Sequence, residues 1–277
     1  MTEFRAVRSL IRGLEILEAL NRRNGSTVTE VAQETGLSRG TVYRMLETLR
    51  EGGYVYRDES DGRYRLTILV KGLSDGFSDE TWVSHIAKPM LEALGKEIVW
   101  PLALATRYGA MLIVRETTDQ NSPLALRRYG GGFHVPMMNT AAGKVYLAFC
   151  DAEQRDTILS ILARSDSHPA NQLARNGKMV AKMLDEVRAA GYGTAHRPDL
   201  KQVSFAVPVM SDGQIFATIT LRYIDSAMTV AEAIQRYLAP VQKTANAIGE
   251  AVARRNEEAL TGAARAAGDQ VNSLDRR

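Results

Sequence analysis

The segment TVTEVAQETGLSRGTVYRMLETLREGGYV, residues 27–55, constrains the fold most, because two short amphipathic patterns meet there at Gly36. Thr27 and Glu30 have the spacing of a capping box, in which a hydroxyl and a carboxylate bind free amides at the start of a helix. Gly36 is suited to end that helix, and Ser38 is suited to cap the next one. The segment therefore predicts two short helices joined by a tight turn.

A further helix is predicted before this segment and a hairpin after it. Over residues 7–21, apolar side chains recur at helical spacing: Leu10, Ile11, Leu14, Leu17 and Leu20. After the glycine pair at 52–53, the alternating sequence YVYRDESDGRYRL predicts a strand, a turn at Asp61-Gly62 and a second strand. This order of elements is typical of a winged helix-turn-helix, which presents its last helix to the DNA major groove. A small helical protein–protein module is the alternative.

The last helix of this pattern, residues 38–51, carries the candidate DNA-binding side chains. Val42, Leu46 and Leu49 are expected to face inward, which leaves polar side chains at the helix start and on the opposite face to reach phosphates and base edges. Arg63 lies beside the hairpin turn and is expected to contact the DNA backbone or minor groove. The candidate DNA-binding residues are Ser38, Arg39, Thr41, Tyr43, Arg44, Thr48 and Arg63.

The gross charge of the chain gives little support for a nucleic-acid partner. The formal net charge is +3, and residues 1–66 hold 11 Arg and no Lys against 10 Asp and Glu. DNA binding by this region therefore requires its arginines to gather on one face.

Length and cysteine content set further bounds. A chain of 277 residues is longer than most single domains, which favours two. The single cysteine, Cys150, rules out an internal disulfide, so no feature indicates an oxidising compartment. The sequence contains no apolar run of membrane-spanning length, and the first residues lack the apolar stretch of a signal peptide. The expected location is the cytoplasm, with no membrane partner.

The sequence after about residue 79 mixes strand and helix patterns. WPLALATRY and AMLIVRETT form a predicted hairpin, and helices are predicted at Ala141–Phe149, from Asp151 to about Arg164, and at Met179–Ala190. SFAVPVM and IFATITLRY are predicted strands around a Ser-Asp-Gly turn, and a final helix is expected from near Thr229 to about Arg254. The mixture predicts an α+β domain, with a frayed tail over residues 256–277.

Catalytic and cofactor motifs are missing from the sequence. GGG at 130–132 is not followed by the Gly-Lys-Ser/Thr of a phosphate loop. The four histidines are scattered, with no cysteine or carboxylate at metal-ligand spacing. We therefore expect no catalytic residue, no cofactor and no metal, and an enzyme is the least supported class.

Three motifs resemble the IclR family of transcriptional regulators. TEVAQETGLSRGTVYRMLETLREGGYV with DGRYRLT resembles the family's winged helix-turn-helix, and NTAAGKVYLAFC and GYGTAHRPDLKQVSFAVPVMSDGQIFATITL resemble parts of its effector domain. The likeness spans about residues 7–254. Within the family, EIVWPLALATRYGAMLIVRETT and YIDSAMT are most similar to activators of 3-(3-hydroxyphenyl)propionate catabolism.

The resemblance implies a domain order and a set of partners. A winged domain (1–66) and a linker helix (67–78) would precede a GAF-like effector domain (79–255). The family implies a homodimer or homotetramer that binds double-stranded operator DNA, and RNA polymerase is a further partner if the protein is an activator. Leu66, Leu69, Val70 and Leu73 form an apolar stripe on the linker, which either packs on its own domain or, as the family suggests, pairs with a second subunit.

The resemblance also implies a small-molecule site. The small side chains and free amides of Ala141 and Ala142 suit the carboxylate of an organic acid, and an aromatic acid is expected from the subfamily. Ser204 and Thr220 match polar positions of the family's pocket. Arg222 replaces a small hydroxyl residue of glyoxylate-responsive members, and is either a carboxylate clamp or an exposed strand residue. Other candidate lining residues, each of which is otherwise core, are Trp100, Tyr129 and Met137.

Overall fold

The computed structural model describes residues 6–73, 82–166 and 168–274, with backbone alone at 256 and 258–274. Internal contacts divide the chain into two compact units, Met1–Ser78 and Asp79–Arg277. We refer to them as the first unit and the second unit. The expected linker falls partly outside the described residues, which resume at Trp82.

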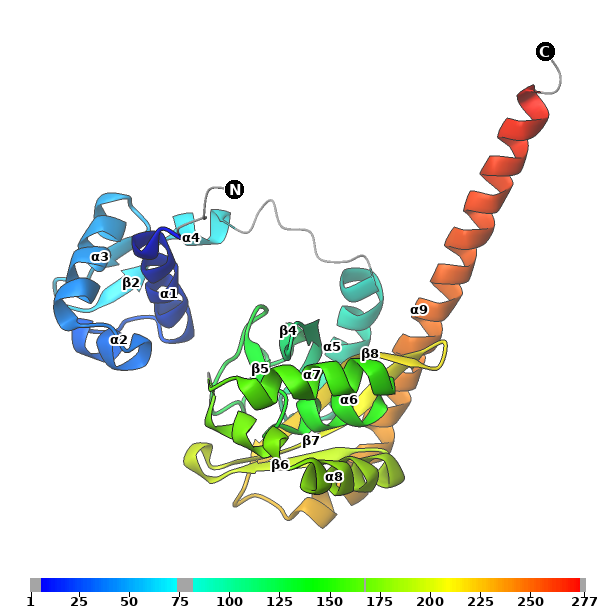
Figure 1. Cartoon of the computed structure of the whole chain (residues 1–277). Coiled ribbons are helices and arrows are strands. Elements are labelled where there is room, and N and C mark those ends of the chain that lie inside the picture. The colour runs from blue at the N-terminus through cyan, green and yellow to red at the C-terminus, as the bar shows by residue number, and fades with distance from the viewer. Residues whose placement is uncertain (1–5, 74–81, 167, 275–277) are drawn as a thin grey trace. The chain divides into compact units, whose positions relative to one another are not determined.

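Within residues 6–73, the first unit consists of helices followed by a hairpin and a short helix (blue to cyan in Figure 1). Its elements are α1 (Arg8–Arg22), α2 (Val28–Thr35), α3 (Arg39–Glu51), β1 (Val55–Arg57), β2 (Tyr64–Leu66) and α4 (Ile68–Gly72). The two strands pair in antiparallel fashion, with Val55 opposite Leu66. The predicted helix-turn-helix with a hairpin is confirmed.

Local capping explains where α2 and α3 begin. Thr27 and Glu30 form the complete capping box, and Gly36 ends α2 with a φ of 70°, a left-handed conformation that glycine adopts without strain. Ser38 caps α3 by accepting a hydrogen bond from the amide of Thr41. These caps fix the turn between the helices at the residues that the sequence predicts.

Fewer apolar side chains of α1 are buried in the core of the first unit than the helical spacing predicted. Ile16, Ala19 and Leu20 are buried against residues of α2, α3 and the hairpin. In contrast, Leu10 is 63% exposed and Leu14 is 51% exposed. The apolar surface of α1 therefore continues outside the core.

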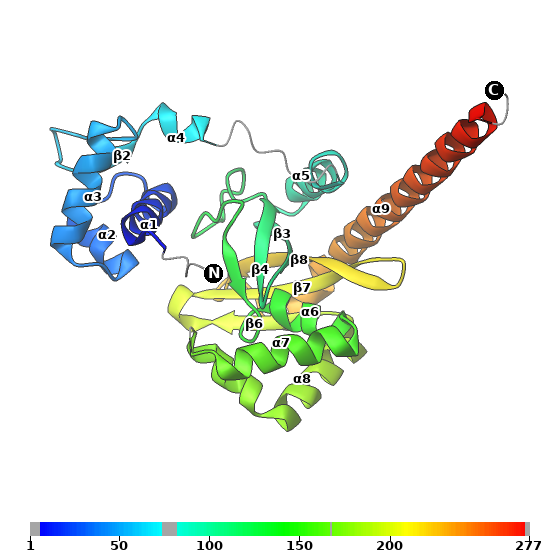
Figure 2. The same ribbon diagram turned by 45° about the horizontal axis from the view of Figure 1, so that its top comes forward.

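The second unit is an antiparallel sheet covered on both faces by helices (Figure 1, Figure 2). The strand order is β5-β4-β3-β8-β7-β6, and each adjacent pair is antiparallel. The strands are β3 (Leu102–Tyr108), β4 (Met111–Thr117), β5 (His134–Pro136), β6 (Gly193–Arg197), β7 (Gln202–Ser211) and β8 (Gln214–Ile224). The helical elements are η1 (Val83–Ala87), α5 (Lys88–Glu97), α6 (Ala141–Phe149), α7 (Ala152–Arg164), η2 (Pro169–Arg175), α8 (Gly177–Ala190), η3 (Pro198–Leu200) and α9 (Val230–Leu274).

Each face of the sheet has its own apolar cluster. One cluster joins α5 and α9 to side chains such as Phe205 and Leu221, and the other joins α6, α7 and α8 to side chains such as Leu112 and Ala206. Because successive strand residues point to opposite faces, β7 and β8 contribute alternate residues to each cluster. We call the two sides the α9 face and the α6 face. The predicted α+β class is confirmed.

Helix α9 differs from the sequence prediction at its end. A helix was expected to stop near Arg254 and to be followed by a frayed tail, but α9 continues to Leu274. Residues 251–268, AVARRNEEALTGAARAAG, are rich in Ala, Glu and Arg, which are strong helix formers. Intrinsic propensity therefore accounts for the longer helix.

Candidate functional site

The first candidate surface is the outer side of α3. Val42 and Leu46 are buried and Met45 packs partly against the same core, whereas Tyr43 and Arg44 are exposed and face away from it. Arg39 and Arg44 are exposed, and no ion pair or side-chain hydrogen bond is found for either within the described residues. Tyr43 is 50% exposed beside them. The two guanidinium groups are thus available as donors to phosphate or base edges.

The predicted hydroxyl contacts of α3 are already engaged within the helix. The Ser38 and Thr41 hydroxyls lie 2.9 Å apart and share one hydrogen bond at the N-cap. Thr48 donates its hydroxyl proton to the carbonyl oxygen of Arg44 at 2.9 Å. DNA contacts by these three hydroxyls stay predictions. In the structure their hydrogen bonds are made within α3 and its N-cap, and so stabilise the helix that carries Arg39 and Arg44.

Arg63 differs from its predicted role. Its Nη1 donates to the carbonyl oxygen of Gly25 and to Glu30 Oε2, both at 2.8 Å, and its side chain is one-third exposed. The guanidinium therefore ties the hairpin to the start of α2 rather than extending from the turn. Sequence spacing did not reveal this contact because its partners lie 33 and 38 residues earlier in the chain.

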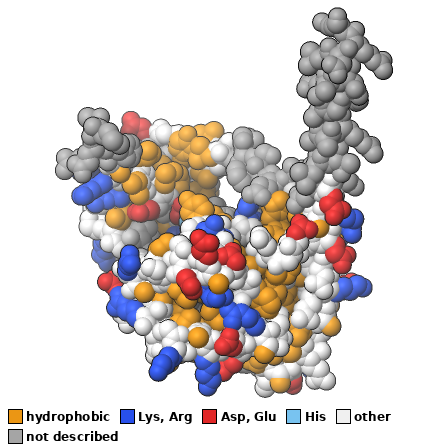
Figure 3. Space-filling view, turned by 45° about the vertical axis from the view of Figure 1, so that its right-hand side comes forward, with side chains coloured by type: hydrophobic (Ala, Val, Ile, Leu, Met, Phe, Trp, Pro, Cys, Tyr) orange, Lys and Arg blue, Asp and Glu red, His pale blue; other side chains and the backbone are white. Residues whose placement is uncertain are grey.

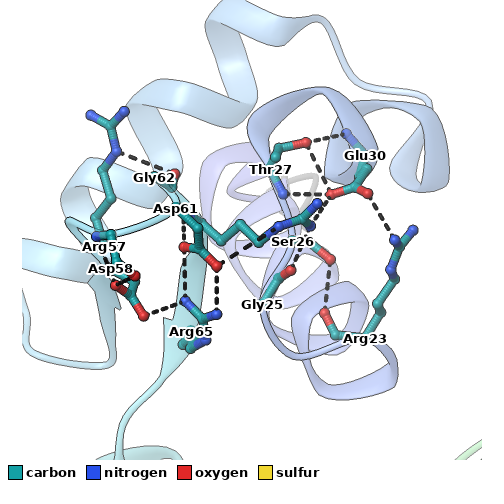
Figure 4. Close-up of polar contacts among 12 residues, drawn as sticks. Arg23, Gly25, Ser26, Thr27, Glu30, Arg57, Asp58, Asp61, Gly62 and Arg65 are labelled. Carbon is teal, nitrogen blue, oxygen red and sulfur yellow. Dashed lines mark hydrogen bonds and ion pairs between the residues drawn. The ribbon is translucent and has the colours of Figure 1, made fainter.

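The other two arginines of the hairpin have unequal freedom. Arg65 donates to Asp58 at 2.8 Å and to Asp61 at 2.7 Å. Arg57 is exposed; its Nε donates to the carbonyl oxygen of Gly62 at 3.3 Å, and its guanidinium lies over the ring of Tyr64, 5.9 Å from the centroid. Its terminal nitrogens point away from Asp58 and Asp61 (Figure 4). Arg57 is consequently the hairpin arginine best placed to bind DNA, although its position in the sequence did not distinguish it.

Four carboxylates of the first unit, those of Glu30, Glu47, Asp58 and Asp61, have a lowered pKa. The backbone amide of Thr27 is the main cause of a lowered pKa for Glu30. The hydrogen bond from Arg65 lowers the pKa of Asp61 to about 2. Burial, followed by the hydrogen bond that its hydroxyl donates to Glu47 at 2.6 Å, raises the pKa of Tyr64 to about 12. This last contact fastens α3 to the hairpin.

The second candidate site begins at the N-terminus of α6. Thr140 caps the helix by accepting from the amide of Gly143 at 3.1 Å, and its carbonyl oxygen accepts from the amide of Lys144. By helix geometry this leaves the amides of Ala141 and Ala142 free, and both residues are buried. Free amides at a helix start attract a carboxylate.

Polar residues of β7 and β8 lie on the α6 face. Ser204 is directly opposite Arg222, and Ala206, a member of the α6-face cluster, is opposite Thr220. Since alternate residues share a face, Thr218, Thr220 and Arg222 form one polar row. The structure therefore brings together the helix start and the three predicted strand positions, Ser204, Thr220 and Arg222.

Arg222 is buried, which excludes its interpretation as an exposed strand residue. Its Nη2 pairs with Asp119, whose side chain is fully buried, and its guanidinium lies over the ring of Tyr129, 4.7 Å from the centroid. Asp119 lies just after β4 and also accepts from the amide of Tyr129 at 2.8 Å. No sequence pattern marked Asp119 as a site residue, because it is 103 residues from Arg222 in the chain.

Three buried side-chain atoms in the described chain lack a hydrogen-bond partner: Asn139 Oδ1, Thr218 Oγ1 and Arg222 Nη1. Asn139 directly precedes the cap of α6, and the other two belong to the polar row of β8. Burying a polar group without a partner costs free energy, so such atoms are uncommon in stable proteins. Their location on one face is the observation that marks this region as a binding site.

Two further lining candidates lie on opposite faces. Trp100 packs in the α9-face cluster, with its ring centroid 6.3 Å from that of Tyr223, so its predicted contact with a ligand on the α6 face is wrong. Met137 is fully buried in the α6-face cluster. Residues 101–105, PLALA, are all apolar and show no alternation, so the sequence did not indicate which of them point to which face of the sheet. Met137 and Tyr129 stay candidates.

The described residues contain no group of three or more His, Cys, Asp and Glu side chains that could hold a metal ion. Cys150 is buried, and burial raises the pKa of its thiol. Over the same ranges, no helix is both long and apolar enough to cross a membrane. On the face in Figure 3, basic and acidic side chains are interspersed rather than segregated.

Comparison with protein families explains the two sites. Residues 9–59 match the IclR helix-turn-helix domain, and residues 78–250, more than half of the chain, match the IclR C-terminal domain of bacterial transcriptional regulators. The chain belongs to the IclR family. Both matched domains belong to DNA-binding regulators, so the protein is a transcriptional regulator with an effector domain and not an enzyme.

IclR-family relatives match along most of the chain. The DNA-binding transcriptional repressor YiaJ of Escherichia coli is 29% identical over 87% of this chain and 86% of its own. The Pca operon regulatory protein of Acinetobacter baylyi is 25% identical over 86% and 87%. The crystal structure of Thermotoga maritima IclR covers 90% of this chain and all of its own, with a TM-score of 0.61 and 21% identity. These matches support the family and fold, but not the closer resemblance to activators of 3-(3-hydroxyphenyl)propionate catabolism.

Proposed function

We propose that this IclR-family regulator binds its operator through Arg39, Tyr43 and Arg44 of α3 and through Arg57 of the hairpin. The unpaired state of Arg39 and Arg44 supports this proposal most directly, because other arginines of the first unit are tied to carboxylates. Free guanidinium groups on the outer side of a recognition helix are suited to guanine edges and phosphates.

Selection from a random DNA library with the full-length protein tests this proposal. We expect one recurring sequence, and fluorescence anisotropy should show that it binds at least a thousandfold more tightly than unrelated DNA at the same salt concentration. Replacing Arg57 by Ala should reduce the affinity for both DNAs and reduce the salt slope by about one, as for loss of a phosphate contact. Enrichment of no sequence would contradict operator recognition.

The effector is proposed to be a small organic acid bound on the α6 face. Its carboxylate would accept from the free amides of Ala141 and Ala142, and its apolar body would lie near Tyr129 and Met137. Ser204 and Thr220 supply polar contacts from the sheet. The three unpartnered buried atoms of this face support a polar ligand there.

Calorimetry with the full-length protein tests the effector site. Aromatic acids should bind, whereas their primary amides should bind at least tenfold more weakly, because the amide lacks the charge that the helix start attracts. Equal affinity for an acid and its amide would place the carboxylate site elsewhere. The solved IclR homologue of Microbacterium hydrocarbonoxydans complexed with 4-hydroxybenzoate makes aromatic acids the first choice of probe.

A homodimer or homotetramer is proposed from the apolar surface of the first unit. Leu10 and Leu14 of α1 are more than half exposed, as are Ile68 and Leu73 at the ends of the α4 segment. Exposed apolar side chains in such numbers favour pairing with a second copy. Analytical ultracentrifugation should show a multimer that Leu14→Lys shifts towards monomer, while Arg12→Lys, on the same helix, should have no effect.

The direction of regulation is proposed to be activation of an aromatic-acid catabolic operon, in the cytoplasm and with RNA polymerase as a partner. The basis for this direction is the similarity of two sequence motifs alone, and the Pca operon regulatory protein among the relatives supports the type of pathway. A reporter gene behind the selected operator should rise when protein and acid are both present. A fall on addition of the protein would make it a repressor, as the relative YiaJ is named.

A further inference from the structure

Tyr64 connects α3 to the accessible arginine of the hairpin. The residue is 1% exposed, and its hydroxyl donates to Glu47 Oε1 at 2.6 Å. Within the hairpin it is directly opposite Arg57, so the two side chains lie on the same face of the strands. The guanidinium of Arg57 lies over the Tyr64 ring, 5.9 Å from its centroid. One buried side chain therefore contacts both elements of the proposed DNA-binding surface.

Arg57 is held against the hairpin turn as well as against the ring. Its Nε donates to the carbonyl oxygen of Gly62 at 3.3 Å, and a Cβ built on Gly62 would lie 3.5 Å from Nη2. Gly62 has a φ of 68°, so the turn takes a conformation that favours glycine and keeps its backbone close to the guanidinium. Nη1 and Nη2 have no hydrogen-bond acceptor in the part of the chain that the structure describes, and they point away from Asp58 and Asp61 (Figure 4). The protein thus orients the guanidinium and leaves two donor nitrogens for another molecule.

The charges beside Arg57 favour an anion as that molecule. The two carboxylate oxygens of Glu47 are occupied, Oε1 by the Tyr64 hydroxyl and Oε2 by Arg50 Nη2 at 2.6 Å. The Tyr64 hydrogen bond is the main cause of the lowered pKa of Glu47, and the charges of Arg50 and Arg57 lower this pKa further. Two arginines therefore share one carboxylate, and Arg57 forms no ion pair of its own among the described residues. A backbone phosphate of DNA supplies the missing negative charge and accepts hydrogen bonds from a guanidinium.

Glu47 also sets the position of Arg57 relative to the DNA-binding residues of α3. It follows Arg44 by three residues and Tyr43 by four, a spacing that brings side chains together on one side of a helix. Tyr43 and Arg44 are exposed, whereas Tyr64 lies in the core of the first unit. The hydrogen bond between Tyr64 and Glu47 thus fixes the hairpin beside the turn of α3 that carries Arg44.

We infer that Tyr64 is a positioning residue for operator binding, whose hydroxyl and ring hold Arg57 in the orientation that binds a DNA phosphate while α3 lies in the major groove. Tyr64 is too deeply buried to touch DNA itself. This inference rests on the proposed DNA contact of Arg57, and it adds the residue that couples this contact to α3.

Tyr64→Phe tests the inference in the full-length protein, because it removes the hydroxyl but keeps the ring beside Arg57. Fluorescence anisotropy with the DNA selected from the random library should show binding weakened by roughly three- to tenfold, as for residues that act together. The salt slope should fall as well, by no more than the roughly one unit expected for Arg57→Ala.

Tyr56→Phe is the matched control for the loss of a hydroxyl from the hairpin. Tyr56 directly precedes Arg57 but lies on the other face of the strand, and its hydroxyl has no hydrogen bond among the described residues. This variant should bind the selected DNA like the wild type. Calorimetry should show that both variants are folded at the temperature of the binding assay.

A double-mutant cycle with Arg57→Ala gives the decisive comparison. Once the guanidinium is absent, the hydroxyl of Tyr64 has no DNA contact to position. Tyr64→Phe/Arg57→Ala should therefore bind the selected DNA within about twofold of Arg57→Ala alone. A hydroxyl that only stabilises the first unit would instead weaken binding by the same factor with and without Arg57.

Two variants of Glu47 test the same hydrogen bond from the side of α3. Glu47→Gln and Glu47→Ala both remove the negative charge, but only Gln keeps an acceptor for the Tyr64 hydroxyl. Glu47→Ala should therefore bind the selected DNA about threefold more weakly than Glu47→Gln, or more. The difference should vanish when Arg57 is also replaced by Ala.

The outcomes separate this inference from the proposed DNA-binding surface. If Arg57→Ala binds the selected DNA as tightly as the wild type, the proposed contact of Arg57 is wrong, and the inference falls with it. If Arg57→Ala weakens binding but Tyr64→Phe does not, the contact stands and the positioning role is wrong. The positioning role is also wrong if Tyr64→Phe weakens binding equally with and without Arg57, or if the two Glu47 variants bind alike.

Discussion

Both units carry arginine–carboxylate pairs at their surfaces, but within the described residues only the second unit also holds a buried one. In the first unit, arginine–carboxylate pairs lie at the surface, where Arg63, Arg65 and Arg50 hold the helices and hairpin together. In the second unit, Arg222 and Asp119 form a buried pair beside buried polar atoms that lack partners. In the first unit, an unpaired surface arginine is therefore the candidate for DNA binding. In the second unit, the candidate for effector binding is a buried arginine that is already paired.

The same contrast distinguishes structure from function within one residue type. Many arginines of the first unit form ion pairs that stabilise its short helices and hairpin, whose apolar core is small. Among the arginines without an ion pair in the described part of the first unit, Arg39 and Arg44 lie on the helix that a helix-turn-helix presents to DNA. The second unit has two apolar clusters, and its buried ion pair lies beside the unpartnered atoms on which the proposed effector site rests.

The largest expected effect follows from breaking the buried pair. Asp119→Ala leaves the charge of Arg222 uncompensated and should destabilise the second unit by about 3–5 kcal/mol. The only two tryptophans, Trp82 and Trp100, belong to the second unit, so tryptophan fluorescence during denaturation reports its unfolding alone. A surface control, Asp61→Ala, should leave this transition unchanged. Equal stability of Asp119→Ala and wild type would mean that the pair is not formed in solution.

A smaller effect is expected from Arg63→Ala. Loss of its contacts with Gly25 and Glu30 should loosen the hairpin and the start of α2, which lowers the melting temperature of the first unit by a few degrees. Hydrogen-exchange mass spectrometry should show faster exchange over residues 24–31 and 55–66. Arg57→Ala, on the neighbouring strand, should leave exchange nearly unchanged. Weakened DNA binding by Arg63→Ala with unaltered exchange would restore Arg63 as a direct DNA contact.

A smaller effect again is expected from acid: the stability of the first unit should fall gradually as the pH is lowered. The pKa values of Glu30, Glu47, Asp58 and Asp61 are all lowered in the folded protein. Such groups stabilise the fold above their unfolded pKa, near 4, and this contribution is lost as pH falls towards the folded values, about 2 for Asp61. The first unit contains no tryptophan, so its unfolding is the calorimetric transition that tryptophan fluorescence does not report. Between pH 5 and pH 2.5 this transition should move to lower temperature.

The acid effect has an internal control. Arg65 is the main cause of the lowered pKa of Asp61, so Arg65→Gln should reduce the stability at neutral pH and flatten the pH dependence. An acid sensitivity that is the same in this variant would show that the other carboxylates dominate.

Sequence patterns predicted the features that depend on near neighbours. The caps at Thr27 and Ser38, and the left-handed Gly36, follow from residues at most three positions away. Strand β6 was not predicted, because GTAHR lacks a clear alternation of apolar and polar residues and is held by its partner β7. Local chemistry therefore accounts for most element boundaries, with tertiary pairing needed for the rest.

The sites divide along the same line. The outer face of α3 was predictable, because burial of Val42 and Leu46 fixes where Arg44 points. The partners of Arg63 and Arg222 were not, since they lie 33 to 103 residues away in the chain. Whether an arginine is free or paired depends on such distant carboxylates, and a single sequence carries no record of them.

Operator binding by Arg44→Ala and Arg50→Ala tests most directly the central claim that unpaired arginines of α3 bind DNA. Both residues are exposed on the same helix, but Arg50 is paired with Glu47 at 2.6 Å while Arg44 has no partner among the described residues. Fluorescence anisotropy on the selected operator should show a loss of about 1–3 kcal/mol for Arg44→Ala, and little change for Arg50→Ala. Equal losses for the two variants, or unchanged binding by Arg44→Ala, would contradict the account.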